Sequence, residues 1–312
     1  MTYKVLVTCP PMLRQIDLFR EKFAELDMDI TTPDVVQTLS VEELKTIVPL
    51  HDGWIIGDDP ANSDVFQAGK AGKLKVAVKW GIGVDNVDFA ACESLGIPIT
   101  NTPGMFGAEV ADLAMCYMLG LARDAFFIDR EVRAGKWPKP AGITLREKTV
   151  GVVGLGDIGK NIAKRANAHD LNIIGWDPHA KKLSDYIELK NDWPTGIEKC
   201  DFIIFACALT EKTQHMFNYS ILEKLKPGVR VVNVSRGPLI SETALLDGLT
   251  SGIIKSAALD VFEDEPLKQS HPILAHDFCI LGSHNASNTT DAVIRASDTA
   301  IEILLGMLKK AR

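Results

Sequence analysis

The strongest local indication of the fold is the stretch Thr149-Val-Gly-Val-Val-Gly154-Leu-Gly156-Asp-Ile-Gly159. It opens with a short β-branched run typical of a buried strand, and an amphipathic helical pattern follows at Ile162, Ala163 and Ala166. A G-x-G-x-x-G spacing between a strand and a helix allows a tight turn, the close approach of a ligand and close packing of helix on strand. The stretch therefore predicts a βαβ unit with an anion site at the start of its helix.

Asp177 strengthens this interpretation. It ends the next predicted strand, about twenty residues after the glycines, where a carboxylate accepts the ribose hydroxyls of a dinucleotide. The same carboxylate would repel a 2′-phosphate, so NAD is favoured over NADP. Lys181 and Lys182 lie just downstream and could accept that phosphate, so this preference stays open. The alternative is a glycine turn without a ligand, followed by an aspartate that caps a loop.

Strand-like and helix-like segments alternate on both sides of this stretch, which predicts an α/β protein with parallel sheets covered on both faces. Six strand candidates belong to the second half of the chain: Thr149 to Val153, Asn172 to Trp176, Phe202 to Phe205, Val229 to Asn233, Ser256 to Val261 and Cys279 to Leu281. The first hundred residues hold four: Lys4 to Thr8, Gly53 to Ile56, Leu74 to Lys79 and Ile97 to Thr100. We therefore expect two Rossmann-like, doubly wound domains, with the active site in the cleft between them.

The domain boundaries follow from two apolar helices. The segment Asn288 to Lys310 carries one apolar stripe and is expected to return to the first domain. This gives a flavodoxin-like substrate domain of residues 1–100 plus 288–312 and a nucleotide domain of residues 101–287. The segment Ala108 to Ala122 is too apolar for a solvated linker and predicts packing between domains or in a homodimer. Ser40-Val-Glu-Glu43 predicts a helix start with a capping box.

Composition narrows the class of protein. The 312 residues carry a formal net charge of −7 and are 46% hydrophobic, so we expect a folded protein with no nucleic-acid partner. The apolar run at the N-terminus is too short for a signal peptide or a membrane span, so we also expect no membrane partner. The six cysteines are scattered without a C-x-x-C pair, which favours reduced thiols in a cytoplasmic protein.

Three runs downstream of the glycine stretch carry polar residues at predicted strand ends. They are Val231-Val-Asn-Val-Ser-Arg236-Gly-Pro, Ala257-Ala-Leu-Asp260-Val-Phe-Glu-Asp-Glu265-Pro266 and Ile280-Leu-Gly-Ser-His284. With the run Lys79-Trp-Gly81-Ile-Gly83-Val-Asp85-Asn86 and the loop Asn101-Thr-Pro103-Gly104, the chain resembles the D-2-hydroxyacid dehydrogenase family over nearly its whole length. That family includes phosphoglycerate dehydrogenase, hydroxypyruvate reductase and D-lactate dehydrogenase.

The resemblance implies a catalytic set of Arg236, Glu265 and His284. A guanidinium grips a planar carboxylate through two hydrogen bonds and polarises the keto oxygen. An imidazole protonates that oxygen as hydride arrives from the nicotinamide, because it titrates near neutral pH. An anionic neighbour such as Glu265 favours the imidazolium form and fixes the ring. The expected activity is NAD-dependent interconversion of a small 2-hydroxy acid and its 2-keto acid.

The resemblance also implies ligand contacts, and no metal. Cofactor contacts fall on Gly154, Gly156, Asp157, Ile158, Gly159, Asp177, Cys207, Ala208, Thr213, Val234, Ser235, Arg236, Asp260, His284 and Ala286. Substrate contacts fall on Lys79, Trp80, Gly81, Ile82 and Gly83, with Arg236 completing the clamp. The chain departs from the family's usual pattern at Met105-Phe106, at Ala208 in place of a common proline, at the Gly-Ser before His284 and at the Asn-Ala-Ser after it.

Plainer interpretations exist for each residue. Arg236 could be a surface residue, Glu265 part of a solvated acidic run and His284 a satisfied loop residue. A dinucleotide-sensing regulatory or corepressor-like protein on the same fold is the competing function, and an oxidase or hydratase with a resident dinucleotide is a third. All three functions use the same fold, so the fold does not distinguish them. An assay of turnover with added cofactor does.

The turn Ile56-Gly57-Asp58-Asp59-Pro60 bears on the substrate. Phosphate-binding relatives tend to carry a cation there, whereas two carboxylates would repel a phosphate. Lys79 is the nearest cation in the sequence, and Trp80 and Phe106 would add apolar bulk. The sequence predicts an unphosphorylated 2-keto acid.

Overall fold

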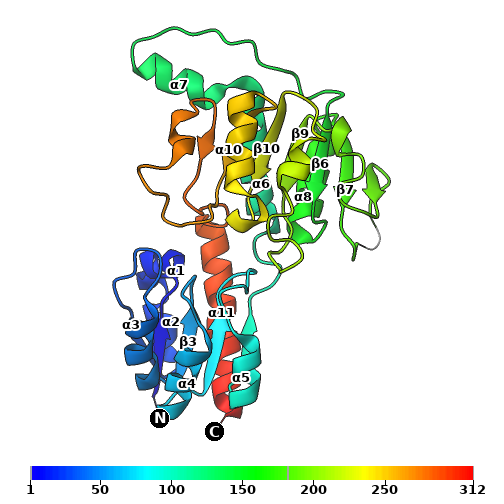
Figure 1. The fold of residues 1–312 in the computed structure, drawn as a ribbon. Helices are drawn as coiled ribbons and strands as arrows, with labels where there is room; N and C mark the ends of the chain where they lie inside the picture. The colour runs from blue at the N-terminus through cyan, green and yellow to red at the C-terminus, as the bar shows by residue number, and fades with distance from the viewer. Residues whose placement is uncertain (1, 181–182, 312) are drawn as a thin grey trace. The chain divides into compact units, whose positions relative to one another are not determined.

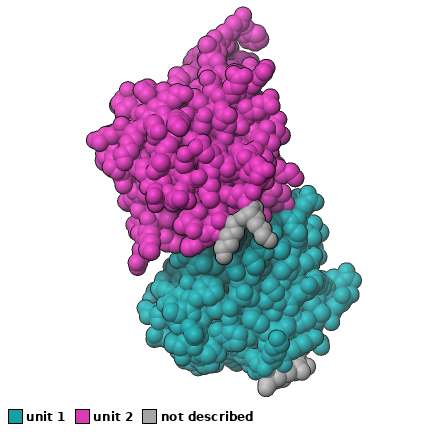
Figure 2. Space-filling view, turned by 90° about the vertical axis from the view of Figure 1, so that its right-hand side faces the viewer, with its two compact units in different colours: residues 1–106, 287–312 teal, residues 107–286 magenta. Residues whose placement is uncertain are grey.

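The protein is described by a computed structural model covering residues 2–180 and 183–311 (Figure 1). It divides into two compact units, coloured separately in Figure 2: unit 1 is Met1–Phe106 with Ser287–Arg312, and unit 2 is Gly107–Ala286. The boundaries expected from the sequence after residues 100 and 287 thus lie after residues 106 and 286.

Unit 1 is built on a five-stranded parallel sheet in the order β2-β1-β3-β4-β5. The strands are β1 (Tyr3–Val7), β2 (Met28–Thr31), β3 (Gly53–Ile56), β4 (Val76–Lys79) and β5 (Ile99–Asn101). Every residue of β3 and β4 is buried, as expected for central strands covered on both faces. The edge strand β2 was not expected from the sequence, because its side chains are half exposed.

The helices of unit 1 include one from the far end of the chain. They are α1 (Pro10–Arg14), α2 (Arg20–Glu25), α3 (Val41–Ile47), α4 (Ser63–Ala71), α5 (Phe89–Leu95) and α11 (Thr290–Lys310). Figure 1 shows α11 beside the strands of the N-terminal unit, and its apolar stripe packs on β3 and β4. The capping box predicted at Ser40 and Glu43 is present at the start of α3.

Unit 2 is built on a seven-stranded parallel sheet in the order β12-β11-β10-β9-β6-β7-β8. The strands are β6 (Thr149–Val153), β7 (Asn172–Trp176), β8 (Ile187–Lys190), β9 (Phe202–Phe205), β10 (Val229–Asn233), β11 (Ile254–Leu259) and β12 (Ile280–Leu281). The sequence analysis predicted six of these and missed β8, which again is a partly exposed edge strand. The strand order changes direction beside β6 and β9, where ligands bind in sheets of this kind.

The helices of unit 2 are α6 (Gly107–Arg123), α7 (Ala125–Arg133), α8 (Asp157–Asn167), α9 (Tyr219–Leu222) and α10 (Glu242–Ser251). The apolar face of α6 packs on α8, β10 and β11 of its own unit. The prediction that this segment packs between domains or subunits is therefore wrong for that face, because the long stripe finds its partner inside unit 2.

The cysteines and the length of the apolar helices bear on the class of protein. All six cysteines are free thiols, and four of them, Cys9, Cys92, Cys200 and Cys279, are buried. Burial raises the pKa of these four thiols. Within the described ranges, no helix has both the length and the apolar character needed to cross a membrane.

Candidate active site

The glycine loop connects β6 to α8 in unit 2. Gly154 has a φ of +91°, which a glycine adopts at little cost, and its amide donates to the carbonyl of Trp176 at 2.8 Å. A Cβ at Gly159 would lie 1.9 Å from the carbonyl oxygen of Gly154, so only glycine allows the helix to start this close to the loop. A Cβ at Gly156 would meet nothing within 4 Å, so that side of the loop is open to a ligand.

These features fit the pyrophosphate of a dinucleotide. Gly156 is the N-cap residue of α8 and has no side chain to cap the first turn. Asp157 and Ile158 open the helix, so the amides of that turn can serve an anion, assisted by the helix dipole. The loop is thus shaped for the group that the spacing of its glycines predicts.

Asp177 follows β7 and faces the same loop. One of its oxygens, Oδ2, accepts a hydrogen bond from the amide of Leu155 at 2.8 Å, and Oδ1 accepts one from the amide of His179 at 2.7 Å. The carboxylate is therefore held beside the glycine loop by two backbone amides. Lys181 and Lys182, on which the question of NADP depended, lie outside the described residues.

A second loop, after β9, lies against the first. A Cβ at Gly154 would come within 2.7 Å of the backbone nitrogen of Cys207. The hydroxyl of Ser235 donates to the carbonyl of Cys207, and the hydroxyl of Thr213 donates to the carbonyl of Ala208 at 2.8 Å. Val234, which precedes Ser235 after β10, is buried. The expected cofactor residues of β6, β9 and β10 are thus brought together at one edge of the sheet.

His284 and Glu265 form a direct pair. Nδ1 of His284 lies 2.8 Å from Oε2 of Glu265, and both side chains are about three-quarters buried, with exposures of 24% and 22%. The other carboxylate oxygen, Oε1, accepts a hydrogen bond from the amide of Phe262 at 3.0 Å. The carboxylate is therefore fixed at both oxygens, and it orients the imidazole through Nδ1.

The backbone of His284 is held by Asp260. Its amide donates to the carbonyl of Asp260 at 2.6 Å, and its φ is +55°. The buried carboxylate of Asp260 accepts the amide of Ala286 at 2.8 Å and the hydroxyl of Tyr117 at 3.2 Å. Burial and the nearby Asp260 raise the pKa of Tyr117, so that hydroxyl stays a donor. Asp260 was expected from the sequence among the cofactor contacts, whereas its partner Tyr117, which comes from α6, was not expected there.

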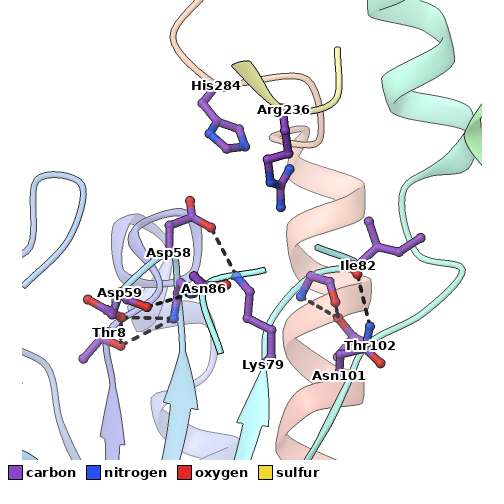
Figure 3. A network of polar contacts seen from close by, with 12 residues as sticks. Thr8, Asp58, Asp59, Lys79, Ile82, Asn86, Asn101, Thr102, Arg236 and His284 are labelled. Carbon is purple, nitrogen blue, oxygen red and sulfur yellow. Dashed lines mark hydrogen bonds and ion pairs between the residues drawn. The ribbon is translucent and has the colours of Figure 1, made fainter. Parts of the chain in front are cut away.

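Arg236 follows β10 by three residues. One terminal guanidinium nitrogen donates to the carbonyl of Ser235 at 2.9 Å, and the carbonyl of Arg236 accepts from the side chain of Asn233 at 2.8 Å. Figure 3 shows the side chains of Arg236 and His284 next to each other and pointing the same way. Unit 2 thus brings the three expected catalytic residues to the carboxyl ends of neighbouring strands.

In unit 1, Lys79 ends β4 and is only 2% exposed. Its ammonium donates to the carbonyl of Gly57 at 2.6 Å and to Asp58 at 3.1 Å. Figure 3 shows Lys79 directed at Asp58. The side chain of Asn86 donates to the same carbonyl at 3.1 Å. Lys79 therefore holds the turn of Gly57 and Asp58 in place, and its positive charge is paired with Asp58.

Asp59 differs from Asp58. Its side chain is fully buried and accepts hydrogen bonds from the amide of Leu39 at 2.9 Å, from the amide of Gly57 at 3.2 Å and from the hydroxyl of Thr8. Burial raises the pKa of this carboxyl group. The expectation that both carboxylates of this turn would repel a phosphate therefore rests on Asp58 alone, because Asp59 lies in the core of unit 1.

The remaining substrate candidates form the loop after β4. Gly81 has a φ of +122° and its amide donates to the hydroxyl of Thr102 at 2.8 Å. Ile82 is 42% exposed, and Gly83 is the next residue of the loop. Trp80 is buried, packs against Phe106 with tilted rings whose centroids are 5.1 Å apart, and donates to Ser297 of α11. Trp80 and Phe106 thus pack against each other in unit 1, and their contribution of apolar bulk to a substrate pocket stays a prediction.

Comparison with known proteins gives one consistent result. The model of the D-isomer specific 2-hydroxyacid dehydrogenase NAD binding domain matches residues 115–286. A hydroxypyruvate reductase of Thermotoga maritima is 37% identical over 85% of this chain and 87% of that protein. A D-3-phosphoglycerate dehydrogenase of Archaeoglobus fulgidus is 34% identical over 98% of this chain, which spans only 57% of that protein. A solved structure from Thermus thermophilus has a TM-score of 0.87 at 28% identity, covering 98% of this chain and 97% of that one.

Proposed function

The chain belongs to the D-isomer specific 2-hydroxyacid dehydrogenase family, and from this we propose that it interconverts a small 2-keto acid and its 2-hydroxy acid with NAD. The observation that carries the proposal is the Glu265–His284 pair, which lies on the same sheet as the glycine loop. A nucleotide-binding protein without chemistry does not need an imidazole held by a carboxylate, whereas proton transfer to a keto oxygen does.

Each residue has a separate task in the proposed reaction. The bound cofactor supplies the hydride. Arg236 binds the substrate carboxylate and polarises the keto oxygen, because its guanidinium stays charged at every working pH. His284 gives a proton to that oxygen, and Glu265 stabilises the imidazolium beforehand. The loop Gly81 to Gly83 is proposed, from the family resemblance, to offer backbone donors to the same carboxylate.

The competing function is a dinucleotide-sensing regulator or corepressor on the same fold. Residues Arg236, Glu265 and His284 would then have no reason to occur together. The test is oxidation of NADH in the presence of glyoxylate, hydroxypyruvate, pyruvate and a branched keto acid. Turnover that disappears in Arg236→Ala supports the enzyme, and binding of NADH without turnover of any keto acid supports the regulator. Turnover without added cofactor would instead support an enzyme with a resident dinucleotide.

The substrate class is proposed to be unphosphorylated. The support comes from unit 1, where the buried ammonium of Lys79 is paired with Asp58 and the carbonyl of Gly57. A cation that is already neutralised attracts a phosphate dianion weakly. The phosphoglycerate dehydrogenase relative is also much longer than this chain, so its name alone does not decide the substrate.

A homodimer is proposed for the whole protein, on a surface different from the one predicted. Helix α7 has no buried residue, and Phe126 and Val132 on it are 39% and 41% exposed. Trp137, in the loop that follows, is 78% exposed. A second copy would cover this apolar surface, and light scattering that shows a monomer at working concentration would refute it.

The free cysteines support a reducing, cytoplasmic compartment, and the net charge of −7 supports the absence of a nucleic-acid partner.

A further inference from the structure

Unit 2 contains a second group of histidines and carboxylates, close in sequence to the catalytic pair but distinct from it. Glu242, the first residue of α10, and Glu263, in the loop after β11, bind each other's backbone. The amide of Glu242 donates to Oε1 of Glu263 at 3.1 Å, and the amide of Glu263 donates to Oε1 of Glu242 at 3.0 Å. This reciprocal contact fastens the loop to the start of α10.

His271 binds the other carboxylate oxygen of Glu242. Its Nε2 lies 2.9 Å from Oε2 of Glu242, and its Nδ1 accepts the amide of Ile273 at 3.3 Å. Because Nδ1 accepts, the proton of the neutral ring is on Nε2, which then donates to Glu242. The His271 side chain is 16% exposed and that of Glu242 22%, so water competes little for this bond. We call Glu242, Glu263 and His271 the clasp.

His215 adds a contact from a further segment. Its Nε2 lies 3.0 Å from Oε1 of Glu263, although this pair is more exposed, at 44% and 33%. The clasp brings two carboxylates together, which costs free energy unless donors or positive charge offset it. The helix dipole favours anions at the start of α10, and the imidazoles of His215 and His271 lie beside the carboxylates. Together they offset this cost.

The clasp is connected to both parts of the proposed catalytic set. Glu263 follows Phe262, whose amide holds Oε1 of Glu265, and Oε2 of Glu265 holds Nδ1 of His284. On the other side, Gly237 touches the same segment so closely that a Cβ on it would lie 1.9 Å from the carbonyl carbon of Phe262. Gly237 directly follows Arg236. A shift of the segment 262–263 would therefore move the Glu265 carboxylate. The segment would also lose its packing against Gly237, the residue after Arg236.

We propose that Glu242, Glu263 and His271 are positioning residues that keep the Glu265 carboxylate on Nδ1 of His284. This inference rests on the proposed function for its kinetic consequence, but the geometry it concerns exists without substrate. The other ion pair of the loop, Lys268 with Asp264 at 2.9 Å, is internal to the loop and highly exposed. It therefore makes no contact with α10, whereas Glu263 and His271 of the clasp both bind Glu242 at the start of that helix.

The two nitrogens of His271 allow a matched pair of variants. His271→Asn keeps an acceptor for the amide of Ile273 but is too short to reach Glu242. His271→Gln keeps the reach and a donor for Glu242. Lys268→Ala is the control, because it breaks an ion pair in the same loop without touching the clasp. Glu242→Gln and the double variant with His271→Asn complete a double-mutant cycle.

The direct measurement is the titration of the His284 imidazole by NMR in the protein without substrate. His271→Asn and Glu242→Gln are expected to move it toward acid by about half a pH unit, because the anion that favours the imidazolium is no longer held in place. His271→Gln and Lys268→Ala are expected to leave it unchanged. The double variant should shift no further than the larger single one, since both remove the same contact.

Kinetics provide the second measurement. His271→Asn should lower kcat for keto-acid reduction about tenfold, as small displacements of a catalytic group do, and leave the KM for NADH nearly unchanged. The alkaline limb of the pH profile should move with the NMR titration. A lower fraction of folded protein would reduce the amplitude but not move the profile.

The outcomes separate the two proposals. If wild-type protein reduces no keto acid, the proposed function fails, while the NMR titration still tests the clasp. If wild type is active and His271→Asn leaves both the titration and the profile unchanged, the clasp has no positioning role. An equal loss in His271→Asn and His271→Gln would overturn it too, because the bond to Glu242 would then not be the cause.

Discussion

The amide of His284 donates to the carbonyl of Asp260 at 2.6 Å while the residue itself has a φ of +55°. Positive φ is uncommon for residues other than glycine, although asparagine, aspartate and histidine adopt it more often than most, and here the hydrogen bond to Asp260 holds the backbone in it. The next two residues lead to Ala286, whose amide is held by the carboxylate of the same Asp260. The direction of the imidazole is therefore set from the backbone as well as from Glu265.

Removing the imidazole should abolish turnover and leave the cofactor bound. His284→Asn is the better variant, since asparagine tolerates the left-handed backbone and alanine does not. We expect kcat for keto-acid reduction to fall about a hundredfold or more, the usual contribution of a general acid. Binding of NADH, measured by fluorescence, should stay within a factor of two of wild type. Turnover close to wild type would remove His284 from its role.

Replacing the carboxylate partner should change the pH dependence of the reaction. Reduction needs the imidazolium, and the anion of Glu265, 2.8 Å from Nδ1, favours that charged form. In Glu265→Gln the imidazole then loses its proton at lower pH, so the alkaline limb for reduction moves toward acid. For the reverse oxidation, which needs the neutral ring, activity should extend to lower pH. Initial rates from pH 5 to 9 in both directions test this, and an unchanged profile contradicts it.

Much of this arrangement could be predicted from the sequence. Buried central strands such as β3 and β9 are recognisable by their continuous apolar runs, and the glycine stretch fixes β6, α8 and the loop between them. The edge strands β2 and β8 were missed because their half-exposed side chains lack such runs. The local sequence of α6 also does not show whether its apolar face packs on its own sheet or on another subunit.

The contacts of single polar groups were the least predictable part. Asp58 and Asp59 are neighbours in sequence, yet one pairs with Lys79 near the surface and the other lies in the core. The clasp joins Glu242 to His271 across 29 positions of sequence, and no local pattern marks it. Such pairs depend on where loops meet, which is decided by the packing of the whole unit.

The cofactor preference should depend on Asp177. Asp177→Asn removes the charge that repels a 2′-phosphate and keeps an oxygen for the amide of Leu155, which Asp177 holds at 2.8 Å. We expect the ratio of kcat/KM for NADPH to that for NADH to rise roughly tenfold, as for the loss of one charge near a surface. Asp177→Ala should raise the ratio too, with weaker binding of both cofactors because the amide loses its acceptor. A wild type that prefers NADPH would refute the assignment.

The glycine loop gives a prediction about stability. Gly159→Ala places a Cβ 1.9 Å from the carbonyl oxygen of Gly154, so helix and loop must move apart. We expect loss of NADH binding and a lower Tm, because a rigid backbone contact is broken. Gly306→Ala is the matched control: Gly306 lies inside α11 with nothing within 4 Å of its Cβ, and alanine there should stabilise by about 0.5–1 kcal/mol. Equal Tm values for the two variants would contradict the close approach.

The last prediction concerns the substrate. In the family pattern, the turn at Gly57 and Asp58 is where a relative that binds phosphate tends to carry a cation. Here the ammonium of Lys79 is 2% exposed and bound to the carbonyl of Gly57 and to Asp58. A phosphate dianion would have to compete with Asp58 for that cation, so the gain from binding it is small.

We therefore expect at least one of glyoxylate, hydroxypyruvate, pyruvate and a branched keto acid to be reduced with higher kcat/KM than 3-phosphohydroxypyruvate. Asp58→Asn should shift this preference toward the phosphorylated substrate by about fivefold, because the ammonium then lacks its anionic partner. Asp17→Asn is the control, since it removes the same charge from an exposed side chain of the same unit, 89% accessible. A wild type that clearly favours the phosphorylated substrate would show that the Lys79–Asp58 pair does not decide the substrate class. A shift of the same size in both variants would show that net charge, and not this pair, is responsible.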